Sequence, residues 1–118
     1  MKRHEEYMKD KMKDQPSEII RQVGVLASLD TVKLQEAEQS YGDSWKQRGG
    51  VGAFMMLARK WDRLEKQVTE HHYDVFAAIS KDTREEGILD DIRDLRRYLF
   101  LVEAEMSLRV KNESGKRK

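Results

Sequence analysis

The segment from Ile88 to Met106 carries the pattern that most restricts the fold. An α-helix turns by about 100° per residue, so apolar residues spaced three and four apart fall on one side of it. We therefore predict an all-α protein in which this stripe faces the core. No β-hairpin signal accompanies it. The stripe consists of Ile88, Ile92, Leu95, Leu99, Val102 and Met106.

The composition favours one small helical domain. The chain has 118 residues, of which 38% are hydrophobic and 38% charged, with a single Pro. Because it contains no Cys, disulfides, thiolate zinc sites and cysteine nucleophiles are excluded. A chain of this length has no room for a separate cofactor domain. We expect a compact bundle of about five helices that shares its remaining apolar surface in a homo-oligomer.

Apolar spacing and helix-end signals divide the chain into segments. Pro16 suits the first turn of a helix, and Asp30 or Thr31 can cap the next one. Residues 1–15 are a charged arm or loose helix, residues 16–110 the single helical domain, and residues 111–118 a disordered basic tail. The helices are predicted over residues 16–29, 31–40, 51–68, 73–83 and 85–109, with a glycine-containing loop over 42–50.

The charge balance limits the classes of partner. With 23 Lys and Arg against 22 Asp and Glu, the net charge is +1, which disfavours a general nucleic-acid binder. No apolar run approaches the roughly 18 residues that a membrane span needs, and the charged start lacks a signal peptide's apolar stretch. We expect a cytoplasmic protein without a membrane partner.

Two acidic pairs carry the candidate chemistry. On the helix predicted over 51–68, Glu65 projects within an apolar face that includes Trp61, and Asp62 lies at its edge. A carboxylate in that position needs a cation, a proton or a metal. On the last helix, Asp91 and Asp94 fall on the shoulder of the apolar stripe. If the two helices pack antiparallel, the four carboxylates converge in the bundle.

Such an oxygen-ligand set suits Mg²⁺ or Mn²⁺, and Mg²⁺ often shares its coordination with substrate phosphates. Lys60 and Arg63, on the more exposed side of the same helix, are placed to contact phosphate oxygens. The glycines near position 50 leave backbone N–H groups at the helix start, which attract anions. The residues therefore predict a nucleotide-phosphate pocket.

The run from Asp91 to Tyr98 resembles the second metal-binding signature of MazG-like all-α nucleoside triphosphate pyrophosphohydrolases. Asp62 and Glu65 are similar in spacing to that family's first acidic pair. The resemblance covers roughly residues 50–105. It implies a MazG-like bundle and Mg²⁺-dependent cleavage of a nucleotide to monophosphate and pyrophosphate. The four acids would then be catalytic residues, holding the metal that activates water.

A closer resemblance is to the nucleotide modification associated domain family, small proteins common in phages and prophages. It rests on Tyr41-Gly-Asp-Ser-Trp45, on Lys60-Trp-Asp-Arg63 and on Asp94-Leu-x-x-Tyr98. The resemblance implies a protein that handles a modified nucleotide, in the host cytoplasm if the gene is of phage origin. The candidate substrate-binding residues are Tyr41, Trp45, Lys60, Arg63 and Tyr98.

Other interpretations remain open for these residues. Asp91 and Asp94 can form structural ion pairs with Arg96 or Lys60, and Trp45 can plug the core. The protein can be a non-catalytic binder that sequesters a nucleotide or signalling molecule, or a partner of a DNA-modifying enzyme. A third hypothesis is a helical scaffold or DNA-binding protein. Its basic residues would be Arg93, Arg96 and Arg97.

Overall fold

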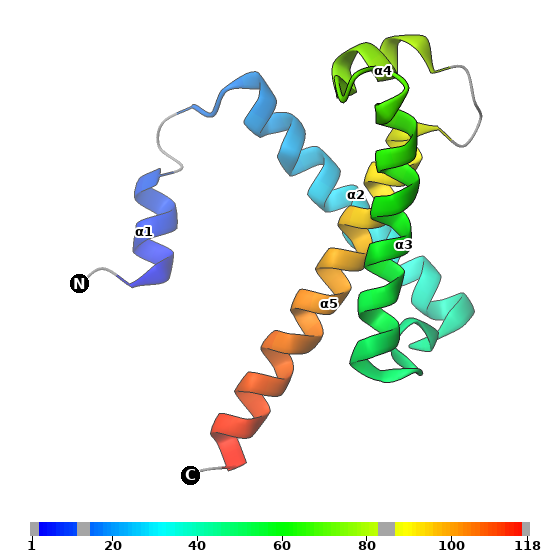
Figure 1. Cartoon of the computed structure of the whole chain (residues 1–118). Coiled ribbons are helices and arrows are strands. Elements are labelled where there is room, and N and C mark those ends of the chain that lie inside the picture. Colours follow the sequence, from blue (N-terminus) through cyan, green and yellow to red (C-terminus); the bar gives the residue numbers. More distant parts are fainter. Residues whose placement is uncertain (1–2, 12–14, 83–86, 117–118) are drawn as a thin grey trace. The chain divides into compact units, whose positions relative to one another are not determined.

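The structure is a computed structural model that describes residues 3–11, 15–82 and 87–116. All regular structure in these residues is helical, which confirms the predicted all-α class (Figure 1). The chain divides into two compact units, Met1–Gly42 and Asp43–Lys118. This boundary falls inside the single domain predicted over 16–110. Over the described residues, no helix has the length and apolar character needed to cross a membrane.

The first unit contains α1 (His4–Lys11) and α2 (Glu18–Tyr41). Ser17 caps α2 by accepting a hydrogen bond from the Ile20 backbone N–H at 3.4 Å. The predicted break at Asp30 or Thr31 is wrong, because α2 continues through both. The Thr31 hydroxyl donates to the Ala27 carbonyl at 3.2 Å, so it bonds the preceding turn of the same helix instead of capping a new one.

The second unit contains a short 3₁₀ turn η1 (Ser44–Lys46), α3 (Gly49–Thr69), α4 (Val75–Lys81) and α5 (Ile88–Lys116). The loop predicted over 42–50 contains η1, and the helices predicted over 51–68, 73–83 and 85–109 correspond to α3, α4 and α5. The predicted ends at Thr83 and Glu85 lie outside the described residues. α5 continues through the described part of the predicted basic tail, as far as Lys116.

α4 is held by capping groups at its start. The Asp74 carboxylate accepts from the backbone N–H groups of Phe76 and Ala77, both at 3.0 Å. The two residues before it, His72 and Tyr73, adopt positive φ values of 56° and 62°. Two consecutive left-handed non-glycine residues are uncommon, and here they reverse the chain between α3 and α4.

α3 and α5 pack side by side and antiparallel (Figure 1). Lys46, just before α3, contacts Glu105 in the second half of α5. Arg63, in the second half of α3, contacts Asp91 near the start of α5. The face of α5 that meets α3 carries Asp91, Asp94 and Glu105. The predicted core stripe lies beside this face, so Ile88 is buried whereas Leu99 and Met106 are exposed.

The apolar core of the described residues is small. Its buried apolar residues are Ala53 of α3, Ala78 of α4 and Ile88 of α5. Most side chains after Val102 on α5 are exposed, because this end of the helix extends past the part that meets α3. Within the second unit, the compact bundle predicted from the sequence is therefore replaced by a helical hairpin with α4 at one end.

Candidate functional site

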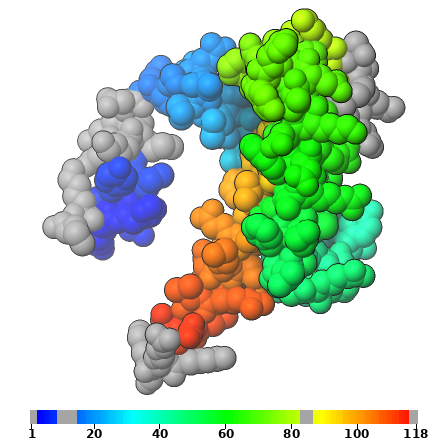
Figure 2. Space-filling view, in the orientation of Figure 1, coloured from blue at the N-terminus to red at the C-terminus, as the bar shows by residue number. Residues whose placement is uncertain are grey.

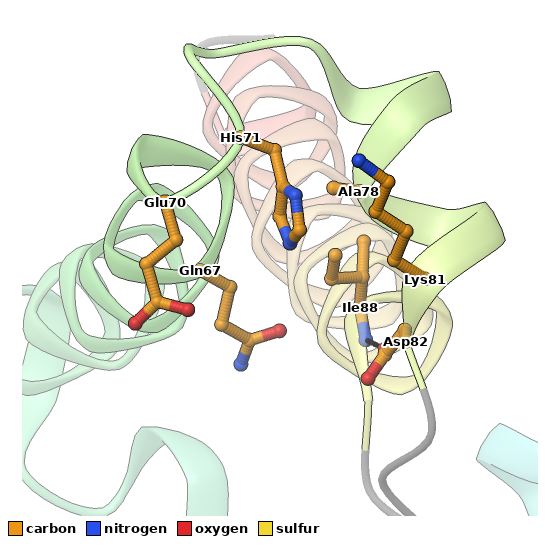
Figure 3. Close-up of a pocket in the computed structure, with 7 residues that line it drawn as sticks. All are labelled: Gln67, Glu70, His71, Ala78, Lys81, Asp82 and Ile88. Atoms are coloured by element: carbon orange, nitrogen blue, oxygen red, sulfur yellow. Dashed lines mark hydrogen bonds between the residues drawn. The ribbon is translucent and has the colours of Figure 1, made fainter.

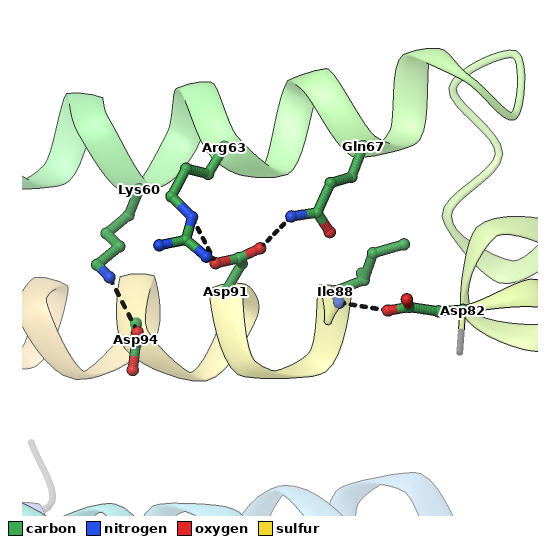
Figure 4. Close-up of polar contacts among 7 residues, drawn as sticks. All are labelled: Lys60, Arg63, Gln67, Asp82, Ile88, Asp91 and Asp94. Carbon is green, nitrogen blue, oxygen red and sulfur yellow. Dashed lines mark hydrogen bonds and ion pairs between the residues drawn. The ribbon is translucent and has the colours of Figure 1, made fainter. Parts of the chain in front are cut away.

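A group of charged and polar side chains joins α3 to α5, and we call it the α3–α5 polar cluster (Figure 4). Lys60 Nζ lies 3.0 Å from Asp94 Oδ2. One turn further along α3, Arg63 Nε lies 3.2 Å from Asp91 Oδ1. Gln67 Nε2 donates to Asp91 Oδ2. The donors are spaced three and four apart and the acceptors three apart, so each set lies on one helix face.

Asp91 is the centre of this cluster. Its side chain is only 2% exposed, and both carboxylate oxygens have partners on α3. Burying a carboxylate is costly unless it is paired and hydrogen-bonded, and Arg63 and Gln67 meet that requirement. Two cations face two carboxylates here, so the cluster has no net charge. It stabilises the contact between the helices by specific pairing.

A second anchor joins the start of the unit to the far half of α5. The Glu105 carboxylate accepts from Lys46 Nζ and from Arg109 Nε, both at 2.7 Å. The hydrogen bonds from Lys46 and then Arg109 lower the pKa of Glu105 below its usual range. Lys46 belongs to η1, so this anchor fixes the turn that precedes α3 against α5.

The predicted four-carboxylate centre is not assembled in this structure. Asp62 and Glu65 are exposed on α3, on the side away from the cluster, and Glu65 accepts from Trp61 Nε1 at 3.1 Å. Asp91 and Asp94 are engaged with cations of α3. In the described parts of the chain, no three Asp, Glu or His side chains lie close enough to hold a metal ion. The residues therefore do not fit the predicted Mg²⁺ or Mn²⁺ site.

The physical reason is the rotation of α3. The sequence places Glu65 within the apolar face that was expected to pack inward. The structure instead turns Lys60, Arg63 and Gln67 toward α5, and Trp61 and Glu65 outward. The alternative interpretation, in which Asp94 pairs with Lys60, is confirmed.

The remaining predicted substrate-binding residues are Tyr41, Trp45 and Tyr98, and Tyr98 lies one turn after Asp94 on α5. Tyr41 is the last residue of α2, in the other unit, and its side chain is exposed. Trp45 lies in η1 and Tyr98 on α5, and both are half-buried. Arg93, a candidate for DNA contact, lies 3.4 Å from Asp90 on its own helix.

A polar cavity of about 290 Å³ lies where α3, α4 and α5 meet (Figure 3). Ala78 and Ile88 line it with apolar surface, and His71 and Lys81 face it from two sides. Glu70, Gln67 and Asp82 complete the lining. Its size is at the lower limit for small-molecule sites, and its charges are mixed. The cavity therefore has no evident preference for a phosphate group.

The side of α3 that is turned away from α5 is apolar and exposed. We call it the outer face of α3, and it consists of Val51, Phe54, Met55, Ala58 and Trp61, followed by Asp62 and Glu65. Val51 is 78% exposed, Phe54 65% and Trp61 53%. Figure 2 shows α3, in green, with one side uncovered by the other elements of the second unit. Such a contiguous apolar face on a charged protein is typical of an interaction surface.

No family model, curated protein or solved structure matches the chain. The resemblances to the MazG-like and nucleotide modification associated domain families therefore stay predictions.

Gln67, which donates to Asp91, was not among the predicted site residues. Lys60, Arg63 and Gln67 follow one another at the spacing of a helix face, which is the signal that could have indicated it. A polar stripe with this spacing faces a second stripe of Asp91 and Asp94 on α5. Matching the two stripes would have predicted the ion pairs without any metal.

Proposed function

We propose that this protein acts as a helical assembly protein that binds a second copy of itself through apolar helix faces. The observation that carries this proposal is the outer face of α3. Phe54 and Trp61 are more than half exposed, whereas the buried apolar residues of the described chain are Ala53, Ala78 and Ile88. The interior of the chain thus leaves much of its apolar surface to a partner.

The energetic argument follows from area. Burial of apolar surface contributes about 25 cal/mol per Å², and a fully buried Phe or Trp removes about 150–250 Å² from water. Covering the outer face of α3 would therefore release free energy that the single chain does not gain. The polar cluster does not compete for this face, because it lies on the opposite side of the helix.

Sedimentation equilibrium across a wide range of protein concentration tests the proposal. We expect the average mass to rise from one chain toward two as concentration increases. Raising the salt concentration should leave most of this association intact, because apolar burial is not screened by ions. A mass equal to one chain at every concentration, up to about 1 mM, would contradict the proposed assembly.

A second candidate function is binding of a nucleoside phosphate, with or without hydrolysis to monophosphate and pyrophosphate. Two of the basic residues predicted for this role, Lys60 and Arg63, do meet the predicted acids Asp91 and Asp94 in one cluster. Lys60 and Arg63 keep some accessibility, at 17% and 43% exposed. A phosphate could displace Asp94 from Lys60, since Asp94 can turn to water.

Native mass spectrometry and thermal denaturation with canonical and modified nucleotides, each with and without Mg²⁺, test this candidate. Retained ligand and a raised Tm that depend on Arg63 would support it, and Arg63→Ala should then weaken binding. Asp94→Asn should leave binding largely intact if no metal is involved. Pyrophosphate release would show catalysis, whereas no bound ligand in any mixture would exclude the candidate.

A further inference from the structure

We infer that α4 holds the first turn of α5 in place through Asp82, so that α4 and this turn open and close as one unit. Asp82 follows the last residue of α4, and its backbone N–H donates to the Ile79 carbonyl at 3.3 Å. Its carboxylate Oδ2 accepts from the backbone N–H of Ile88, the first residue of α5, at 2.6 Å (Figure 4). One residue therefore ends α4 and caps α5. None of these groups lies on the outer face of α3, so the inference is independent of the proposed assembly.

The N-cap of α5 is divided between two residues. The Gly87 carbonyl accepts from the Asp91 backbone N–H at 3.1 Å, which is the first backbone hydrogen bond of the helix. Gly87 has no side chain that could accept a further N–H group at the helix start. Asp82 supplies that acceptor from the end of α4. It thereby satisfies one of the N–H groups that the first turn of a helix leaves without a partner in the helix.

Gly87 leaves the space that the Asp82 carboxylate occupies. Gly87 is buried, and a Cβ added to it would overlap Asp82 Oδ2 and lie 2.7 Å from Asp82 Cγ. The φ of Gly87 lies outside the left-handed region, so the backbone conformation does not itself require glycine here. The missing side chain at Gly87 therefore makes room for the carboxylate that caps α5.

The first turn of α5 also carries the buried acid of the α3–α5 polar cluster. Ile88 is 2% exposed, and Asp91 follows three residues later with both carboxylate oxygens on partners from α3. If this turn opened, Arg63 and Gln67 would lose the group that they bind. The Asp82 cap thus connects the position of α4 to the formation of the cluster.

α4 is too short to be stable by itself. An isolated helix of fewer than about 12 residues is marginal in water, and α4 has seven. It is held by the Asp74 cap at its start, by the complete burial of Ala78 and by the contact of Asp82 with α5. Segments with few buried apolar contacts open more readily than the rest of a protein. We therefore expect α4 and the first turn of α5 to open together without unfolding of the whole unit.

Amide hydrogen exchange, followed by NMR on the whole chain, tests the shared opening. The reporters are the Ala78 N–H in α4 and the Asp91 N–H in α5, and their exchange rates give the equilibrium constant for opening. Asp74→Ala removes the cap at the start of α4, far from the Asp82 contact, and should raise the constant about fivefold for both reporters. Glu103→Ala, which removes an exposed carboxylate in the middle of α5, is the control and should change neither. A rise at Ala78 alone would overturn the inference, because the two helix ends would then be independent.

A double-mutant cycle between Asp82 and Gly87 tests the cap itself. Asp82→Ala removes the acceptor and should raise the opening constant of the Asp91 amide about fivefold. Gly87→Ala should raise it by a similar factor, because the added methyl group displaces the carboxylate. In the double variant the methyl group should have little further effect, since no carboxylate remains to be displaced. Equal factors for Gly87→Ala in both backgrounds would show that the carboxylate does not cap α5, and would overturn the inference.

A conservative variant separates loss of the acceptor from loss of the side chain. Asp82→Asn retains an oxygen that can accept the Ile88 N–H, so it should raise the opening constant less than Asp82→Ala does. Circular dichroism shows whether each variant retains its helices. The Asp74→Ala measurement leaves Asp82 unaltered and remains decisive if Asp82→Ala does not fold. If neither Asp82 variant changes the exchange of the Asp91 amide, other groups hold this turn and the inference fails.

Discussion

The two sides of α3 differ in a direction that is unusual for an amphipathic helix. The side that packs on α5 presents Lys60, Arg63 and Gln67, whereas the outer face presents Phe54 and Trp61. The contact within the chain thus includes a buried polar cluster, whereas the exposed face is apolar. This contrast indicates that the polar cluster makes the intrachain contact specific, while the apolar face is left to the proposed assembly.

The difference also separates two kinds of energy. A paired, buried Asp91 adds little net stability but makes any other pairing of α3 and α5 unfavourable, because it would leave a charge buried alone. Burial of the outer face in the proposed assembly would be driven by the hydrophobic effect, which has no directional preference. Four predictions test this contrast, in order of decreasing expected effect.

The largest effect is expected from placing a charge on each side of α3 in turn. Ala53 is buried and Phe54 is exposed. Ala53→Asp should lower the free energy of unfolding by more than about 3 kcal/mol, because it buries an unpaired carboxylate. Phe54→Asp should change it by less than about 0.5 kcal/mol in dilute solution. Urea denaturation of both variants measures the difference, and equal losses would mean that α3 is not oriented as described.

The next effect compares two neighbouring acids in the first turn of α5. Asp91→Asn should cost about 1–3 kcal/mol, since Arg63 and Gln67 lose a charged partner. Asp90→Asn is the matched control, because Asp90 also lies in the first turn but its ion pair with Arg93 is exposed. That variant should cost less than about 1 kcal/mol, by loss of the helix-dipole interaction. Similar losses in the two variants would contradict the role of the cluster.

A smaller effect is expected from the more exposed ion pair of the cluster, between Lys60 and Asp94. Asp94 is 44% exposed, so its ion pair with Lys60 is partly screened by water. A double-mutant cycle with Lys60→Met and Asp94→Ala should give a coupling energy of about 0.2–1 kcal/mol. It should fall further in 0.5 M salt, since that concentration shortens the screening length. A coupling that is zero at low salt would show that the pair contributes nothing to the helix contact.

The smallest effect concerns Glu105, whose pKa is lowered by Lys46 and Arg109. A lowered pKa in the folded protein stabilises the fold above the ordinary glutamate value of about 4.3, and this contribution disappears as the pH falls through the lowered value. NMR titration of the Glu105 carboxyl should therefore give a midpoint below the ordinary value. Lys46→Met should raise that midpoint, and an unchanged midpoint would argue against the anchor.

Much of the fold could be predicted from local patterns. The all-α class and the positions of α3, α4 and α5 follow from apolar spacing. The continuity of α2 could not, because Thr31 is equally suited to cap a helix and to bond its own preceding turn. The local sequence allows Thr31 to do either, and the surrounding residues decide which structure forms.

The candidate site was predicted in part. The antiparallel packing of the two helices is present, and Lys60 pairs with Asp94, as the alternative interpretation allowed. The placement of Lys60 and Arg63 on the more exposed side was wrong, because both contact carboxylates of α5. The inward placement of Glu65 was wrong, because apolar periodicity shows which side of a helix avoids water without showing which partner covers it. A face that binds another chain has the same pattern as a face that binds the core.

The sequence by itself determined where the helices form and which residues share a side of each one, since both depend on interactions within a few positions along the chain. Only the tertiary structure decided the rotation of α3 about its axis, and with it whether Asp91 meets carboxylates or cations. That choice depends on side chains about 30 residues apart, such as Arg63 and Asp91, whose pairing no local pattern encodes.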